Sequence, residues 1–222
     1  MRILRRALLV AGREASAERR QPDGLVAALT FIGALVLIES LAVGPGEARR
    51  PAIAAALFWI ALLFSALFAA ARSFDRELED DAIDAVVVLE DGRDALYLGK
   101  TLALGALLAI VALAGGLLAL VILDLAVASP ARLAIITMLG VIALPPVVVL
   151  DTLLALRLRA RGVLVAILAL PLLVPMLLAA TAGTASALSG ELDAWSGWAG
   201  LLVAFTLVYT VLGLTIVPAA AE

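Results

Sequence analysis

Six long apolar segments, separated by polar connections, make up most of the chain. Each has about the 20 apolar residues that a helix needs to cross the hydrocarbon core of a bilayer. The six segments are 25–43, 52–71, 101–123, 133–156, 163–182 and 195–217. We therefore predict an all-α integral membrane protein, with residues 1–222 forming a single transmembrane domain of six spans.

The segment before the first span, residues 1–24, has the pattern of an amphipathic helix. Apolar residues at positions 3, 4, 7, 8 and 11 share one side of a helix, whereas arginines at positions 2, 6, 13 and 20 lie towards the other. A basic amphipathic helix is typical of a segment that lies on the inner surface of a membrane. We expect it to end at the turn signal of residues 21–24.

The connection 72–100 is long and strongly acidic. It holds nine of the 19 acidic residues, and Phe74, Leu78, Ala82, Val86 and Leu89 recur at helical spacing, so they would form one apolar stripe. The β-branched run at 86–88 also permits a strand, but a connection of this length has no sheet to join. An amphipathic helix is therefore the favoured interpretation.

The basic residues predict the orientation in the membrane. Thirteen of the 16 lie in 1–24, 72–100 and 157–161, and only Arg49, Arg50 and Arg132 lie in the other connections. Because cytoplasmic connections carry the excess of Lys and Arg, we expect both termini and the connections 72–100 and 157–161 to face the cytoplasm. The chain would then be a multi-pass protein of the cytoplasmic (inner) membrane.

Residues 99–101, Gly-Lys-Thr, raise the question of a nucleotide-binding loop. The phosphate-binding motif is G-x-x-x-x-G-K-[ST], whose backbone N–H groups surround the phosphates. Six residues separate Gly92 from Gly99, and the required glycine position is Asp94, a carboxylate where an anion would bind. We therefore expect no ATPase site in this chain.

Composition excludes several other functions. Of the 222 residues 64% are hydrophobic, the mean hydropathy is +1.15, and there is no Cys or His. Without them the chain has no disulfide, no thiolate or imidazole metal site and no histidine ligand for haem. No constellation of nucleophile and base is recognisable, and the basic residues lack the interleaved aromatics of a nucleic-acid surface.

Three carboxylates lie in or at the ends of spans: Glu39, Asp124 and Asp151. An ionisable group in hydrocarbon costs at least about 2.5 kcal/mol, so each is a functional candidate. Glu39 and Asp124 lie near the external ends, where they can reach water. Asp151 lies one to two turns from the arginines at 157, 159 and 161, within reach of a pairing Arg side chain.

Prolines and small residues interrupt three spans. Pro145 and Pro146 fall in the fourth span, and Pro171 and Pro175 lie four residues apart in the fifth, where they should bend the helix. The third span carries a stripe of small residues that permits close helix packing, within the chain or against a second subunit. These residues are Gly105, Ala109, Ala112 and Gly116.

The whole layout resembles the membrane subunit of ABC-2 exporters, in which an interfacial N-terminal helix precedes span one and a coupling helix follows span two. Within that class the chain is similar to the heme exporter protein B family over essentially its whole length. The family's loop, approximately R-x-F-x-x-[DE]-x-x-[DE]-G-x-L-[DE], and its V-L-P-L-x-x-P stretch have counterparts at 72–84 and 169–175. The matching residues are Arg72, Phe74, Glu77, Asp80, Ile83, Asp84, Pro171 and Pro175, together with Gly99-Lys100 at the entry to span three.

Some positions depart from the family pattern: Asp81 stands where the family has glycine, and Asp151 where a small residue is usual. The resemblance implies that Lys100 marks the inner membrane boundary. It also implies that Phe74 and Leu78 pack in a groove on a partner ATPase while nearby carboxylates pair with its basic residues. The implied coupling residues are Arg72, Phe74, Asp75, Glu77, Leu78, Asp80, Ile83 and Asp84.

The partners implied by the resemblance are a cytoplasmic ABC ATPase subunit, a second copy of this chain, and the haem-handling membrane protein and periplasmic haem chaperone of cytochrome c maturation. ATP and Mg²⁺ would bind the ATPase, and haem would be a substrate of the pathway. This chain would couple ATP hydrolysis to haem export or to release of the haem-loaded chaperone. Two alternatives stay open: a generic ABC-2 permease for another lipid or drug, and a membrane scaffold without transport activity.

Overall fold

The computed structural model describes residues 2–79, 92–157, 163–191 and 193–219. Every regular element in these ranges is a helix, which confirms the all-α prediction. The elements are α1 (Arg2–Arg20), α2 (Asp23–Val43), α3 (Pro45–Ala48), α4 (Pro51–Glu79), α6 (Gly92–Ile122), α7 (Pro130–Arg157), α8 (Val163–Ser189) and α9 (Trp195–Ala219).

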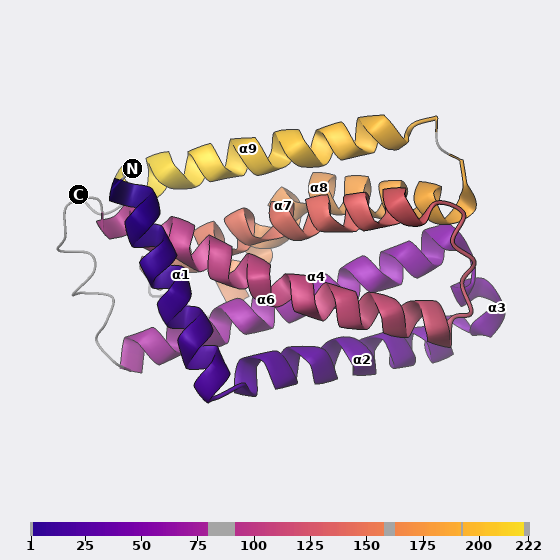
Figure 1. Cartoon of the computed structure of the whole chain (residues 1–222), viewed down its shortest axis with the longest axis horizontal. Coiled ribbons are helices and arrows are strands. Elements are labelled where there is room, and N and C mark those ends of the chain that lie inside the picture. Colours follow the sequence, from indigo (N-terminus) through magenta and orange to yellow (C-terminus); the bar gives the residue numbers. More distant parts are fainter. Residues whose placement is uncertain (1, 80–91, 158–162, 192, 220–222) are drawn as a thin grey trace.

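Six of these helices are long and apolar enough to cross a membrane, so the six predicted spans are confirmed: α2, α4, α6, α7, α8 and α9. They lie side by side along the long axis of the molecule (Figure 1). α1 runs across one end of this bundle, the end at which α9 also finishes, and α3 lies at the opposite end. Chain start and chain end therefore share one side, as the charge distribution predicts; that this side is cytoplasmic stays a prediction.

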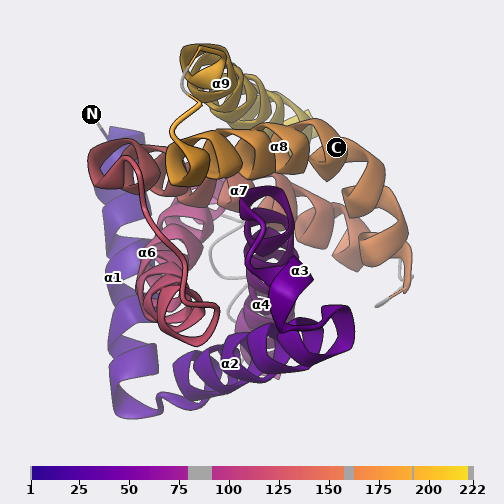
Figure 2. The same cartoon turned by 90° about the vertical axis from the view of Figure 1, so that its right-hand side faces the viewer.

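The six spans are not equally buried. α4 and α7 are the most enclosed, whereas α2 and α9 expose most of their surface. Viewed along the bundle, the other helices surround α4 and α7 (Figure 2). The exposed side chains of the outer helices are mainly Leu, Ile, Val and Phe, as lipid-facing surfaces require.

Glycines let large side chains of one span enter the next. A Cβ at Gly140 of α7 would collide with the ring of Trp59 of α4, and one at Gly115 of α6 would collide with Ile32 of α2. Such small residues allow the close approach by which helices associate in lipid. Trp59 also donates a hydrogen bond from Nε1 to Oγ1 of Thr184, over 2.9 Å, and so links α4 to α8.

The predicted small-residue stripe of α6 packs within this chain. A Cβ at Gly105 would lie 3.6 Å from Cγ of Pro145, and one at Gly116 would lie 3.6 Å from the ring of Phe58. Ala112 is buried, and Ala109 packs against the core. The stripe therefore serves contacts with α4 and α7.

The proline-containing helices behave differently from one another. α7 is helical without a break through Pro145 and Pro146, in the middle of a run in which Ala143 to Asp151 are all buried. α8 bends along its length (Figure 2), and the missing N–H groups of Pro171 and Pro175 are our explanation for that bend.

The contact between Gly140 and the Trp59 ring yields a stability prediction. Gly140→Ala should displace the Trp59 ring, and overpacking of this kind costs about 1–3 kcal/mol. We expect the midpoint of thermal unfolding in detergent to fall by about 2–10 °C. Gly200→Ala is the control, because nothing lies within 4 Å of a Cβ built there. Equal midpoints for the two variants would contradict the packing described.

Candidate functional site

The best-defined polar cluster lies where α1 crosses the end of α4 and the beginning of α6. We call it the three-helix junction, formed by Glu14, Ser73, Phe74, Gly99 and Lys100. Glu14 comes from α1, Ser73 and Phe74 from the last part of α4, and Gly99 and Lys100 from the first part of α6. The junction therefore joins α1 to both flanks of the acidic segment 80–91.

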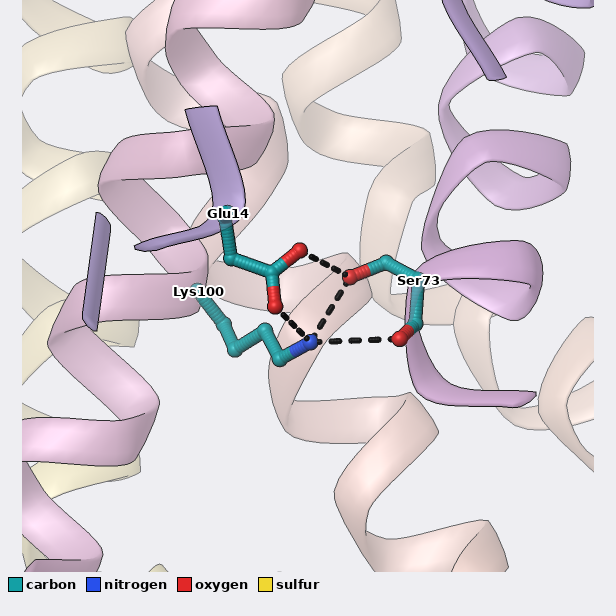
Figure 3. Close-up of polar contacts among 3 residues, drawn as sticks. All are labelled: Glu14, Ser73 and Lys100. Carbon is teal, nitrogen blue, oxygen red and sulfur yellow. Dashed lines mark hydrogen bonds and ion pairs between the residues drawn. The ribbon is translucent and has the colours of Figure 1, made fainter. Parts of the chain in front are cut away.

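Lys100 is the centre of the junction. Its Nζ donates to Oε1 of Glu14 over 2.8 Å, to Oγ of Ser73 over 2.7 Å and to the carbonyl oxygen of Ser73 over 3.3 Å. The Ser73 hydroxyl donates in turn to Oε2 of Glu14 over 3.0 Å. These side chains converge from three helices (Figure 3), and all three ammonium protons find an acceptor.

The junction is largely buried, and this decides its energetics. Lys100 is 2% exposed, the side chain of Glu14 is 16% exposed, and the ammonium lies 4.7 Å from the centre of the Phe74 ring. A charge in such a place is tolerated only when it is paired and hydrogen-bonded, and an aromatic face adds a cation–π attraction. Removing one partner of a buried pair costs about 3–5 kcal/mol, because the other charge is left uncompensated.

Gly99 provides the second attachment of α1. A Cβ at Gly99 would lie 2.5 Å from Cβ of Val10 and 2.9 Å from the carbonyl oxygen of Ala7. Only glycine allows α1 to approach α6 this closely, and Ala7 is fully buried as a result. Leu4 and Leu8, on the other side of α1, are exposed. The apolar stripe that was predicted as one surface therefore packs partly against α6 and partly faces away from the protein.

A third attachment links the end of α1 to the first span. The carboxylate of Glu18 accepts a hydrogen bond from the backbone N–H of Leu25. That N–H belongs to the first turn of α2, whose donors have no partner within the helix and whose dipole favours a negative charge. α1 therefore connects the beginnings of α2 and α6 with the end of α4.

The structure corrects the predicted start of the third span. Residues 92–101 are helical and belong to α6, so the helix begins nine residues earlier than predicted. Lys100 is buried against Glu14 and Ser73, a contact that the sequence did not predict, and its place at the membrane boundary stays a prediction. The predicted loop 72–100 is shortened from both sides, since α4 continues to Glu79.

Tyr97 explains why α6 begins so early. Its ring is fully buried and lies where a Cβ at Gly213 of α9 would be. Its hydroxyl lies 3.1 Å from the carbonyl oxygen of Pro146 and 2.9 Å from that of Tyr209, and donates to them. Tertiary contacts with α7 and α9 therefore hold this turn in the helix.

The predicted coupling residues have different environments. Phe74 is 2% exposed and packs inside this chain, so the expected insertion of its ring into a groove of a partner is not available in this structure. Arg72 is exposed. Asp75, Glu77 and Leu78 belong to the last turns of α4, and only their backbone is described. Asp80, Ile83 and Asp84, with the rest of the predicted amphipathic helix, lie outside the described residues.

The carboxylates in the spans are not brought together. Asp151 is 2% exposed, and its Oδ2 has no hydrogen-bond partner among the residues that the structure describes. The arginine side chains at 157, 159 and 161, its expected partners, lie outside that description. Asp124 is exposed and pairs with Arg49 over 3.4 Å. Glu39 is partly buried and has no described partner for Oε2.

Sequence reasoning missed Glu14, Ser73 and Gly99 as members of one site. A signal for Glu14 was present, because it is one of only three acids, with Glu18 and Asp23, in a segment with six arginines. It lies 86 residues from Lys100, so spacing along the chain could not pair the two.

Comparison with known proteins places the chain in context. The family model described as "CcmB protein" matches residues 2–222. A protein named "Heme exporter protein B" from Bradyrhizobium diazoefficiens is 28% identical over 198 residues, which cover 87% of each chain. A protein of the same name from Pseudomonas aeruginosa is 30% identical over 188 residues, which cover 82% of each chain.

The Gly99 contact yields a test of the docking of α1. Gly99→Leu should force α1 away from α6, and the cost of about 1–3 kcal/mol should raise the undocked population about 5- to 150-fold. Because the chain has no Cys, a single Ala7→Cys reports docking through its rate of labelling by a maleimide. Gly12→Leu is the control, since Gly12 has open space around it. Labelling rates that respond equally to both substitutions would contradict docking at Gly99.

Asp151 yields a prediction in which a substitution keeps or raises the stability, whereas Gly140→Ala lowers it. Asp151→Asn removes a buried negative charge that has no described counter-charge, so the free energy of unfolding should stay the same or rise by about 1–2 kcal/mol. Thermal unfolding in detergent measures it, with Asp124→Asn as the exposed control. A clear loss of stability would show that a cationic partner holds Asp151.

Proposed function

Since this chain belongs to the CcmB family, we propose that it is the membrane subunit of a haem export system that a separate ATPase subunit drives. Both relatives described above are named for haem export. The match extends over residues 2–222, so it includes the spans, α1 and the acidic segment.

One structural observation carries the coupling part of the proposal. The acidic segment 80–91 lies between two helices that run without interruption into the membrane bundle: α4, with 29 residues, and α6, with 31. At a rise of about 1.5 Å per residue each is more than about 40 Å long. A force applied at 80–91 would therefore reach the far side of the bundle through two stiff helices whose near ends the junction holds together.

The sequence in and beside the acidic segment supplies the charges that we propose for the ATPase contact. Asp75, Glu77, Asp80 and Asp84 lie in or beside the segment, with Arg72 at its start and Leu78 and Ile83 as apolar positions. Complementary charge steers and orients association, so we propose that basic residues on the ATPase face these carboxylates. Phe74 acts from within this chain, where it packs against Lys100 and supports the end of α4.

The haem-related part of the proposal concerns movement rather than ligation. The chain contains no His or Cys, so it offers haem neither of these axial ligands. A cavity of about 70 Å³ lined by Phe58, Gly116 and Thr184 is far below the roughly 300 Å³ of the smallest usual ligand pockets. We propose that two copies of this chain work with two ATPase subunits, a haem-handling membrane protein and a periplasmic haem chaperone, and drive haem export or release of the loaded chaperone.

Charge reversal tests the ATPase contact. The triple variant Glu77→Lys, Asp80→Lys, Asp84→Lys should lower co-purification of the ATPase subunit from solubilised membranes about tenfold or more, because like charges would then face each other.

The matched control reverses three acids elsewhere: Glu47→Lys, Asp124→Lys and Glu191→Lys, all of them exposed. Both triple variants must insert into the membrane to equal amounts. Co-purification that is unchanged in the first triple variant would refute the proposed contact. Intact assembly of c-type cytochromes after deletion of the chain would refute the haem pathway and favour export of another lipid or drug.

A further inference from the structure

α1 lies across the end of the bundle and is also attached to both flanks of the acidic segment 80–91. Its Glu14 contacts Ser73, six residues before the end of α4, and Lys100, eight residues after the start of α6. The two flanks are linked directly, because the Lys100 ammonium donates to the hydroxyl and the carbonyl oxygen of Ser73, and the carboxylate of Glu14 ties α1 to both residues.

A buried ion pair is unusual for a contact whose only role is to pack three helices together. Apolar residues of similar volume often hold helices as well as a buried ion pair does, or better, because they carry no desolvation penalty. An apolar contact, however, tolerates sliding, whereas the Glu14–Lys100–Ser73 ring satisfies its donors and acceptors in one arrangement only. The ring therefore defines the relative position of the three helix ends.

We infer that Glu14 and Lys100 are positioning residues for coupling, and that α1, the end of α4 and the start of α6 move as one unit when the ATPase displaces the segment between them. This inference rests on the proposed function and adds α1 to the coupling machinery. Through Glu18 and the N–H of Leu25, the same unit also reaches the first span.

The test separates positioning from simple stability. In Glu14→Leu/Lys100→Met the ion pair is replaced by apolar side chains, so the protein should unfold at the same temperature as the unmodified chain or higher. Assembly of c-type cytochromes in cells, normalised to the amount of ATPase that co-purifies, should nevertheless fall about fivefold or more. The control is Glu47→Leu/Arg50→Met, which removes an exposed ion pair of 3.0 Å at the other end of the bundle and should leave the normalised output unchanged.

A charge swap completes the test if the apolar variant fails to fold. Glu14→Lys and Lys100→Glu should each abolish output, and the double variant should recover at least part of it, because the pair can re-form with its charges exchanged. Normal output from the folded apolar variant, or a swap no better than the single variants, would overturn the inference. Failure of the ATPase to co-purify with the unmodified chain would instead refute the proposed function.

Discussion

Burial of the Lys100 ammonium is the constraint on which the arrangement at this end of the molecule depends. A charge that is 2% exposed has to be neutralised and hydrogen-bonded, and no single helix can supply all the acceptors. Here Glu14 comes from α1 and the hydroxyl and carbonyl of Ser73 come from α4. Hydrogen-bonding of the Lys100 ammonium therefore fixes the rotation of α1 about its axis and the relative position of the ends of α4 and α6.

Small residues set the rest of the packing. In lipid, apolar side chains gain little by leaving their surroundings, so helices associate where they can approach closely. Gly140 receives Trp59, Gly115 receives Ile32, and Gly99 receives the backbone of α1 at Ala7. α6 takes part in two of these contacts, at Gly99 and at Gly115, and is thus the helix against which both α1 and α2 are placed. Because α6 begins before the predicted span 101–123, it contacts α1 at Gly99, outside that span.

These two features together suit a subunit that transmits movement. In the function that we propose, the two long helices would carry displacement, the hydrogen-bonded cluster of Glu14, Ser73 and Lys100 would keep their near ends together, and the acidic segment would contact the partner. Membership of the CcmB family gives this arrangement a biological setting, since the curated relatives are named for haem export. The sequence has no His or Cys, so neither residue can be an axial haem ligand in this chain.

By itself the sequence determined the six spans, the helical class, the shared side of the two ends and the family, because each depends on hydropathy, charge or motif within one segment. Tertiary structure alone decided the length of α6, the burial of Phe74 and the meaning of Gly99 and Lys100. The family motif at the entry to span three marked Lys100 only as a boundary residue and gave no partner for its ammonium. Its carboxylate partner lies 86 residues away, and only folding brings the two within 2.8 Å.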